Sequence, residues 1–269
     1  MSTYQLPHYA ELHALSNFSF QRGASHAEEL VERAQSLGYT ALAITDECSL
    51  AGVVRAHVEA KKQGLKLLPG AEFLVQANDP FRIVVLPHNA EGWGNLCEFI
   101  TAAKRVGDVI EKGSYRVALG ESDFAQLTDC EILLAPLPSI SNATGAINTE
   151  ALCAHVTWAR GLFGTQVWLA VELLQELDDA LRLQQLRQIA RQTGVRLVAA
   201  GNVQMHVRSR KPLHDVMTAI GLGKTVHECG FALQTNAEAH LRPRMRLAEI
   251  YPADLLRATL EVADRKSVV

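Results

Sequence analysis

Short apolar runs alternate with amphipathic stretches along most of this chain, and this alternation constrains its fold more than any other feature. TALAIT (40–45), EILLAPL (131–137) and VRLVAAGN (195–202) have the length and composition of buried strands. Stretches with the apolar spacing of helices, such as ELDDALRLQQLRQIARQTG (176–194), separate many of these runs. Strands joined through helices need right-handed crossovers, which build a parallel sheet. The sequence therefore predicts an α/β fold made of repeated strand–helix units.

Two helices and two further strands are predicted in the first third of the chain. The helix over 25–38 begins with a capping box of Ser25 and Glu28. Strands are predicted over 65–75 and 81–87, and segments 106–130 and 223–250 are predicted to be irregular. A second helix covers 49–64, and we expect its apolar face to be buried, with its histidine packed there rather than binding a metal: Leu50, Val53, Val54, His57 and Val58.

Polar side chains follow the predicted strands at the point where each strand ends. The residues concerned are His13, Asp46, Glu47, Glu72, His88, Glu172, Asn202, Gln204 and His206. In a βα barrel the carboxyl ends of all strands meet at one rim, where chemistry is usually located. An open sheet would bring together only the residues beside its switch point. The pattern therefore favours a barrel.

Charge and cysteine content exclude several classes of protein. The net charge of −3 and the pI of about 6.4 provide no general attraction to nucleic acid. Five cysteines without a CxxC pair argue against a disulfide framework and a structural zinc site. The first residues do not resemble a signal peptide, and no apolar run is long enough to span a bilayer. We expect a soluble cytoplasmic protein with no membrane partner.

Histidine, aspartate and glutamate at a barrel rim suit divalent ions such as Zn²⁺, Mn²⁺ or Mg²⁺. Two or three such ions would activate water for attack on a phosphoester. The alternative interpretation is a rim of ordinary hydrogen-bonded side chains, which is the commoner situation for any single histidine. Residue types alone leave both open.

Several motifs resemble those of the polymerase-and-histidinol-phosphatase (PHP) domain. They are, in order, ELHALSNFS (11–19), ALAITDECSLAGV (41–53), GLKLLPGAEF (64–73) and LVAAGNVQMH (197–206). More narrowly, residues 16–57, 86–96 and 206–226 are similar to the beginning of the error-prone bacterial C-family DNA polymerases, paralogues of the replicative alpha subunit. The resemblance implies a distorted (β/α)₇ PHP barrel. It assigns residues 1–263 to the PHP domain, with a barrel core at about 8–220 and the start of a connection to the polymerase core at 221–263.

The metal-binding pattern of that family is matched only in part. His13 matches the first histidine of its HxH motif, but Leu15 replaces the second. Arg22 stands where an acidic or histidine ligand is expected, and Asn202 and Gln204 replace the aspartate and histidine of the closing DxH motif. Neutral amides are poor ligands for divalent transition ions. The positions that retain ligand chemistry, and would hold an ion only weakly, are His13, Asp46, Glu47, Glu72 and His206.

The resemblance thus predicts a structural segment with a degenerate metal site, no catalytic residue and no cofactor of its own. The whole enzyme would be a DNA polymerase for translesion synthesis and DNA repair, with Mg²⁺ in a polymerase core absent here. Its expected partners are the remaining polymerase domains, DNA through the full-length enzyme, and accessory proteins of mutagenic repair. Two alternatives remain: a free-standing metal-dependent phosphoesterase of the histidinol-phosphatase type, and a non-catalytic interaction module.

The last six residues, 264–269, have a separate interpretation. DRKSVV can be encoded by GATCGGAAGAGCGTCGTG, which matches a widely used sequencing-library adapter. We therefore expect these residues to be an artefact and the natural protein to continue beyond Ala263. Sequencing the gene downstream of that position tests this expectation.

Overall fold

The structure is a computed structural model that describes residues 6–77, 79–106, 108–111, 114–117, 121–137 and 147–264. Its strands are β1 (Ala10–Glu11), β2 (Ala41–Glu47), β3 (Lys66–Val75), β4 (Phe81–Pro87), β5 (Asp108–Glu111), β6 (Ser114–Val117), β7 (Cys130–Ala135), β8 (Val167–Val171) and β9 (Arg196–Ala199). Its helices are α1 (Ala27–Ser36), α2 (Val53–Gln63), α3 (Ala90–Val106), α4 (Glu121–Phe124), α5 (Thr149–Phe163), α6 (Asp179–Thr193), α7 (Lys211–Gly221), α8 (Arg244–Ile250) and α9 (Ala253–Asp264). Short 3₁₀ turns are η1 (Gly164–Gln166), η2 (Arg208–Arg210), η3 (Val226–Glu228) and η4 (Gly230–Ala232).

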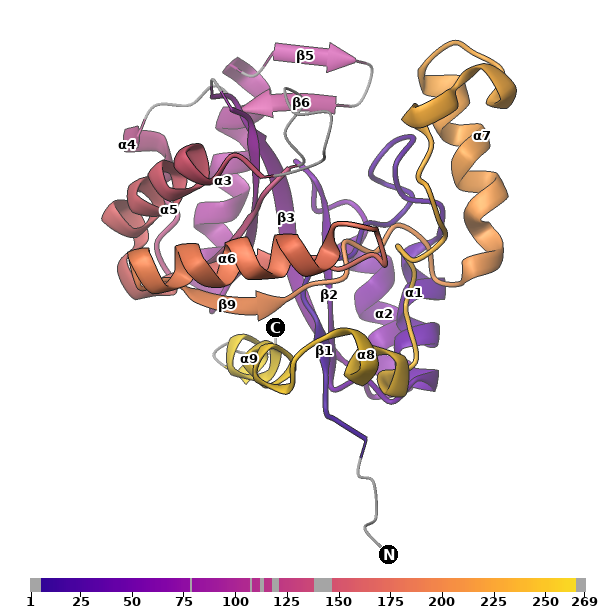
Figure 1. Cartoon of the computed structure of the whole chain (residues 1–269), viewed down its shortest axis with the longest axis horizontal. Helices are drawn as coiled ribbons and strands as arrows, with labels where there is room; N and C mark the ends of the chain where they lie inside the picture. The colour runs from indigo at the N-terminus through magenta and orange to yellow at the C-terminus, as the bar shows by residue number, and fades with distance from the viewer. Residues whose placement is uncertain are drawn as a thin grey trace, which may run out of the picture.

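The main sheet curls into the distorted barrel that the sequence predicts. Its strands follow the order β1-β2-β3-β4-β7-β8-β9, and β5 and β6 form a hairpin that joins β3. The chain beyond β1 and the chain beyond β9 close the curl, since Leu15 N donates to Val203 O (2.8 Å) and Val203 N to His13 O (2.9 Å). Figure 1 shows α1 and α2 at one side of the strands and α3 and α5 at the other.

Strand β4 runs antiparallel to both of its neighbours, β3 and β7, whereas the sequence pattern predicted parallel strands. Residues 76–80 are too few for the helical crossover that parallel strands need, so the chain turns back directly. The end of β4 that precedes His88 therefore lies at the base of the barrel, and Arg82, near its beginning, lies at the rim. The expectation that His88 joins the rim is wrong.

The barrel interior is filled by apolar side chains that α9 completes from below. Ala258, Val262 and Ala263 of α9 belong to the same buried cluster as Leu12 of the first strand segment and Trp168 of β8. Ala10 N in β1 also donates to Thr259 Oγ1 (3.1 Å). A second, larger apolar cluster fills the space between the sheet and the surrounding helices. The end of the expected connection, 221–263, thus contributes directly to the barrel core.

Helix α2 shows a difference between the predicted and the observed buried face. The side chains predicted to be buried include Val54 and Val58, which are 71% and 65% exposed, and His57 is exposed as well. The helix instead buries Ala56 and Ala60. Small side chains let a helix approach its neighbours closely, so this face packs although it is less apolar than the other.

Two regions that were predicted to be irregular contain short regular elements. Residues 106–130 and 223–250 include the hairpin β5–β6 and the short elements α4, η3, η4 and α8.

All five cysteines are free. Within the described ranges, every helix is too short or too polar to cross a bilayer. Residues 265–269 of the expected artefact lie outside the described part of the chain.

Candidate functional site at the barrel rim

The backbone that carries His13 is held by one buried carboxylate. Glu11 Oε1 accepts hydrogen bonds from Leu12 N (3.1 Å), His13 N (3.0 Å) and Gly201 N (2.8 Å). Tyr9 donates its hydroxyl to the other oxygen of the same group (2.8 Å). Gly201 leaves the room that this requires, because a Cβ there would lie 2.3 Å from Glu11 Oε2. Glu11 therefore joins the end of β1 to the end of β9 and fixes the position of His13.

The His13 ring lies between two glutamates at the centre of the rim. Its Nε2 lies 2.6 Å from Glu72 Oε2, and its Nδ1 lies 3.0 Å from Glu172 Oε1. Burial by itself lowers the pKa of His13, but the hydrogen bonds to Glu172 and Glu72 and the charges of both carboxylates outweigh it and raise the pKa to about 9. His13 is therefore protonated at neutral pH, with both ring nitrogens acting as donors.

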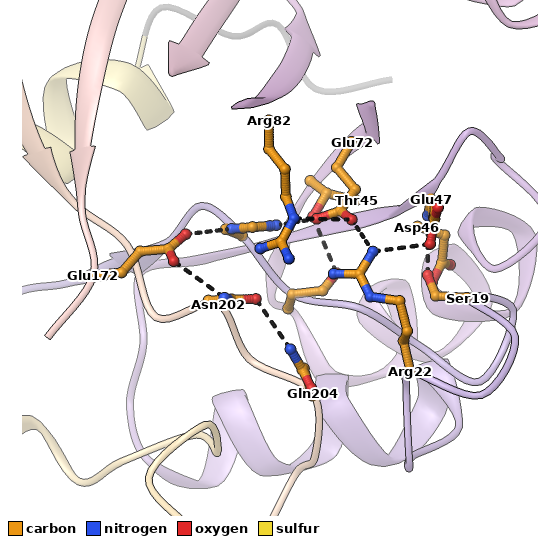
Figure 2. Close-up of polar contacts among 12 residues, drawn as sticks. Ser19, Arg22, Thr45, Asp46, Glu47, Glu72, Arg82, Glu172, Asn202 and Gln204 are labelled. Atoms are coloured by element: carbon orange, nitrogen blue, oxygen red, sulfur yellow. Dashed lines mark hydrogen bonds and ion pairs between the residues drawn. The ribbon is translucent and has the colours of Figure 1, made fainter. Parts of the chain in front are cut away.

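Arg22 supplies a second cation to the carboxylates at the rim. Its Nη1 donates to Glu47 Oε2 (2.9 Å) and to Glu72. Arg82 reaches the group from β4, with Nε 4.0 Å from Glu72 Oε1 (Figure 2). Burial opposes ionisation of Glu72, but the charges of Arg22 and Arg82 and the hydrogen bond from His13 hold the pKa of this carboxyl well below its usual range.

Two amides continue the network on the side of β8 and β9, as Figure 2 shows. Asn202 Nδ2 donates to Glu172 Oε2 (3.1 Å), and Gln204 Nε2 lies 3.4 Å from Asn202 Oδ1. His214 from α7 is hydrogen-bonded through Nε2 to Gln204 Oε1 (2.7 Å). Both amides therefore make hydrogen bonds where ligands to a metal would stand in the family pattern.

The other candidate residues lie outside this network. Asp46 accepts from Ser16 N, Ser16 Oγ and Ser19 Oγ, all at 2.7 Å. The Nδ1 atom of His206 lies 2.8 Å from Ser25 Oγ, away from the rim carboxylates. Leu15 is fully buried. Of the five positions that retain ligand chemistry, the structure thus brings together His13, Glu47 and Glu72.

Three members of the network were absent from the candidate ligand set. Glu172 follows a predicted strand and was recognised as a rim residue, but no motif identified its role. Arg82 was missed because it lies at the beginning of a strand, which becomes a rim position only when the strand runs backwards. His214 lies within a predicted helix, and its sequence neighbours give no signal of a contact with Gln204. His88, by contrast, pairs with Glu131 (3.1 Å) at the base.

The residues at the rim do not fit a divalent metal. The cluster of Glu47, Glu72 and Glu172 is already balanced by protonated His13, Arg22 and Arg82, so an added ion would bring two uncompensated positive charges. Both ring nitrogens of His13 donate to carboxylates and offer no lone pair. In the described part of the chain, the group of three acidic side chains close enough to share an ion is Glu176, Asp178 and Asp179, outside this network. Exposed acidic groups of this kind are common without a metal.

Comparison with known families and sequences gives consistent results. Residues 11–149 match the family described as the PHP domain. The chain is 47% identical over 264 residues to the error-prone DNA polymerase of Dechloromonas aromatica, covering 97% of this chain and 24% of that protein. It is 48% identical over 259 residues to the error-prone DNA polymerase of Pseudomonas fluorescens, covering 96% and 23%. The chain thus spans about a quarter of the length of these curated relatives.

Solved structures support the fold. A putative metal-dependent phosphoesterase from Bifidobacterium adolescentis aligns with a TM-score of 0.52 at 15% identity, covering 73% of this chain and 88% of that one. An amidohydrolase from Chromobacterium violaceum, solved with bound sulfate and no metal, aligns with a TM-score of 0.54 at 16% identity and the same coverage. At these identities the similarity concerns the barrel alone.

Proposed function

Because this chain belongs to the PHP domain family, we propose that it is the N-terminal domain of an error-prone DNA polymerase, with a structural role and an ion-paired rim in place of a metal centre. The observation that carries this proposal is the balance of charges at the rim. Three carboxylates, Glu47, Glu72 and Glu172, face three cations, His13, Arg22 and Arg82. Buried charges are tolerated when they are paired and hydrogen-bonded in this way.

The names of the relatives support the polymerase part of the proposal. In the longer protein, nucleotide addition would use Mg²⁺ held by domains outside this chain, on DNA that those domains bind. Translesion synthesis, DNA repair, accessory proteins of mutagenic repair and a cytoplasmic location follow from the same interpretation. If the reading frame continues downstream of Ala263 for roughly three further lengths of this chain, this part of the proposal is supported. A stop codon directly after native sequence favours an interaction module instead.

The structural role follows from what the rim pairs connect. Arg22 lies in the loop after β1, Glu47 ends β2, and Glu72 lies in β3, so one guanidinium links three neighbouring segments. His13 extends the connection to Glu172 after β8. Metal ions would make equivalent cross-links in a metal-binding barrel, whereas here the chain's own cations make them.

Thermal unfolding with and without metal tests the rim. We expect the melting temperature to stay the same with Mn²⁺, with Zn²⁺ and with EDTA, because a ligand that binds the folded state raises it. We also expect no turnover of p-nitrophenyl phosphate. A rise in melting temperature with Mn²⁺, together with turnover that is lost in His13→Ala, would instead identify a metal-dependent phosphoesterase.

A further inference from the structure

Helix α7 carries an apolar stripe that faces outward. Leu213, Val216 and Ile220 are 42%, 44% and 64% exposed, and their spacing places them on one side of the helix. The opposite side faces the barrel and buries His214, which contacts Gln204. Figure 1 places α7 at the side of the molecule away from α3 and α5. Amphipathic helices normally turn their apolar stripe towards the core, so this one is oriented for another partner.

Two further exposed apolar side chains, Leu222 and Phe20 (40% and 52% exposed), line a pocket of about 320 Å³ together with His214, on the other side of α7 from this stripe. We call Leu213, Val216 and Ile220 the α7 patch. Val54 and Val58 on α2 are also exposed, and they form a pair rather than a row of three. Contiguous apolar surface of this kind marks interaction sites in soluble proteins.

Three buried polar atoms belong to residues around this pocket. Arg22 Nη2, His214 Nδ1 and Gln234 Oε1 are buried and make no hydrogen bond to any residue that the structure describes. All three residues line the pocket between Phe20 and Leu222. Buried polar atoms nearly always have partners.

We propose that the α7 patch is the docking surface for the polymerase part of the longer chain, an inference that rests on the proposed function. The curated relatives have about three quarters of their length outside the region that this chain matches. Domains within one chain bury about 600–1,500 Å² against each other. Such an interface needs an apolar centre on this domain, and the α7 patch supplies one at the rim end of the barrel.

A chimera tests the proposal. Residues 1–263 of this chain replace the matching quarter of the Dechloromonas aromatica polymerase, and hydrogen exchange is compared between the chimera and the isolated chain. We expect exchange at residues 211–222 to slow at least about tenfold in the chimera, since a docked helix opens less often. Exchange in α2 should be the same in both proteins. Equal exchange at 211–222 in both proteins would overturn the proposal.

Matched double variants separate docking from folding. Val216→Glu with Ile220→Glu should abolish the protection in the chimera and leave the melting temperature of the isolated chain within about 2 °C, because both positions are exposed. Val54→Glu with Val58→Glu, at similarly exposed positions on α2, should leave the protection intact. If the α7 double variant keeps the protection, the proposal fails.

Two further readouts identify other outcomes. If light scattering shows the isolated chain to be a dimer that the α7 double variant dissociates, the patch binds a second copy and the proposal is wrong. Primer extension by the unaltered chimera reports on the proposed function separately. Protection of α7 without primer extension supports the docking surface and contradicts the polymerase role. Primer extension without protection of α7 supports the polymerase role and contradicts the docking surface.

Discussion

Arg22 Nη1 lies 2.9 Å from Glu47 Oε2, so a cation from the loop after β1 meets the carboxylate at the end of β2. The same nitrogen donates to Glu72. A guanidinium is always protonated in proteins and presents its donors in a fixed plane. It therefore joins two carboxylates regardless of the metal supply, and the stability of this barrel should depend on it.

Replacing Arg22 by glutamine should strongly destabilise the domain. The variant leaves Glu47 and Glu72 buried near each other without their shared cation, and breaking a buried ion pair costs about 3–5 kcal/mol. Urea unfolding followed by circular dichroism measures the loss. Arg55→Gln is the control, because its partner Glu28 lies 3.7 Å away at an exposed site, where a pair contributes about 1 kcal/mol or less. Equal losses in both variants would contradict the role given to Arg22.

Protonation of His13 should make stability depend on pH. Its pKa is about 9 in the folded chain against the ordinary value of 6.5, so its contribution is full below pH 6.5 and is lost as pH rises to 9. The contribution is on the order of 3 kcal/mol. We expect the free energy of unfolding to fall between pH 6.5 and 9, and His13→Gln to remove that part of the slope. The exposed His57→Gln should keep it, and a His13→Gln profile parallel to the unaltered one would contradict this assignment.

Gly201→Ala should disturb the carboxylate that fixes His13. The added methyl group would lie 2.3 Å from Glu11 Oε2 and 2.9 Å from Val203 Cγ2, so both must move. Overpacking of this kind costs about 1–3 kcal/mol, measured by urea unfolding. Gly161→Ala is the matched control, because Gly161 is an exposed position of helix α5 where an added Cβ meets no neighbouring atom within 4 Å. This variant should raise the free energy of unfolding by about 0.5–1 kcal/mol. If Gly201→Ala leaves the free energy of unfolding unchanged, Glu11 has space to shift.

Arg22→Asp should give the rim a response to metal. The change removes a cation, adds a carboxylate beside Glu47 and Glu72, and restores the acidic residue of the family pattern. We expect millimolar Mn²⁺ to raise the melting temperature of this variant above its value in EDTA, because the ion compensates the excess negative charge. Arg55→Asp makes the same charge change at an exposed site and should not respond. If neither variant responds, Arg22 is not what excludes the metal.

Much of the rim could be predicted because the direction of each strand decides which of its ends lies there. His13, Glu47 and Glu172 all follow or end strands that run in one direction, so their side chains meet wherever the sheet curls. Strand β4 runs in the opposite direction, so Arg82 lies at the rim and His88 does not. A signal was available, since no helix-length segment separates the predicted strands 65–75 and 81–87.

Side-chain partners were harder to predict than strand order. The capping box was expected at Ser25 and Glu28, but His26 N pairs with Glu29 Oε2 (2.8 Å). Ser25 Oγ instead accepts from His206 N (2.8 Å), a contact between segments 181 positions apart. The sequence around Ser25 cannot reveal that a distant residue, His206, will use its hydroxyl group instead of the helix. Arg22 was recognised as a departure from the family pattern, while its two carboxylate partners became clear only in three dimensions.

Helix α9 also determines when the barrel can be completed. The hydrogen bond from Ala10 to Thr259 joins positions 249 apart, nearly the full span of the chain. A ribosome adding about 5–20 residues per second therefore exposes the first strand for many seconds before its last partner emerges. During that time the strand has an open edge that a neighbouring nascent chain can pair with. Completion of the barrel therefore waits for the segment that carries Thr259, and until then the N-terminal strand lacks its last partner.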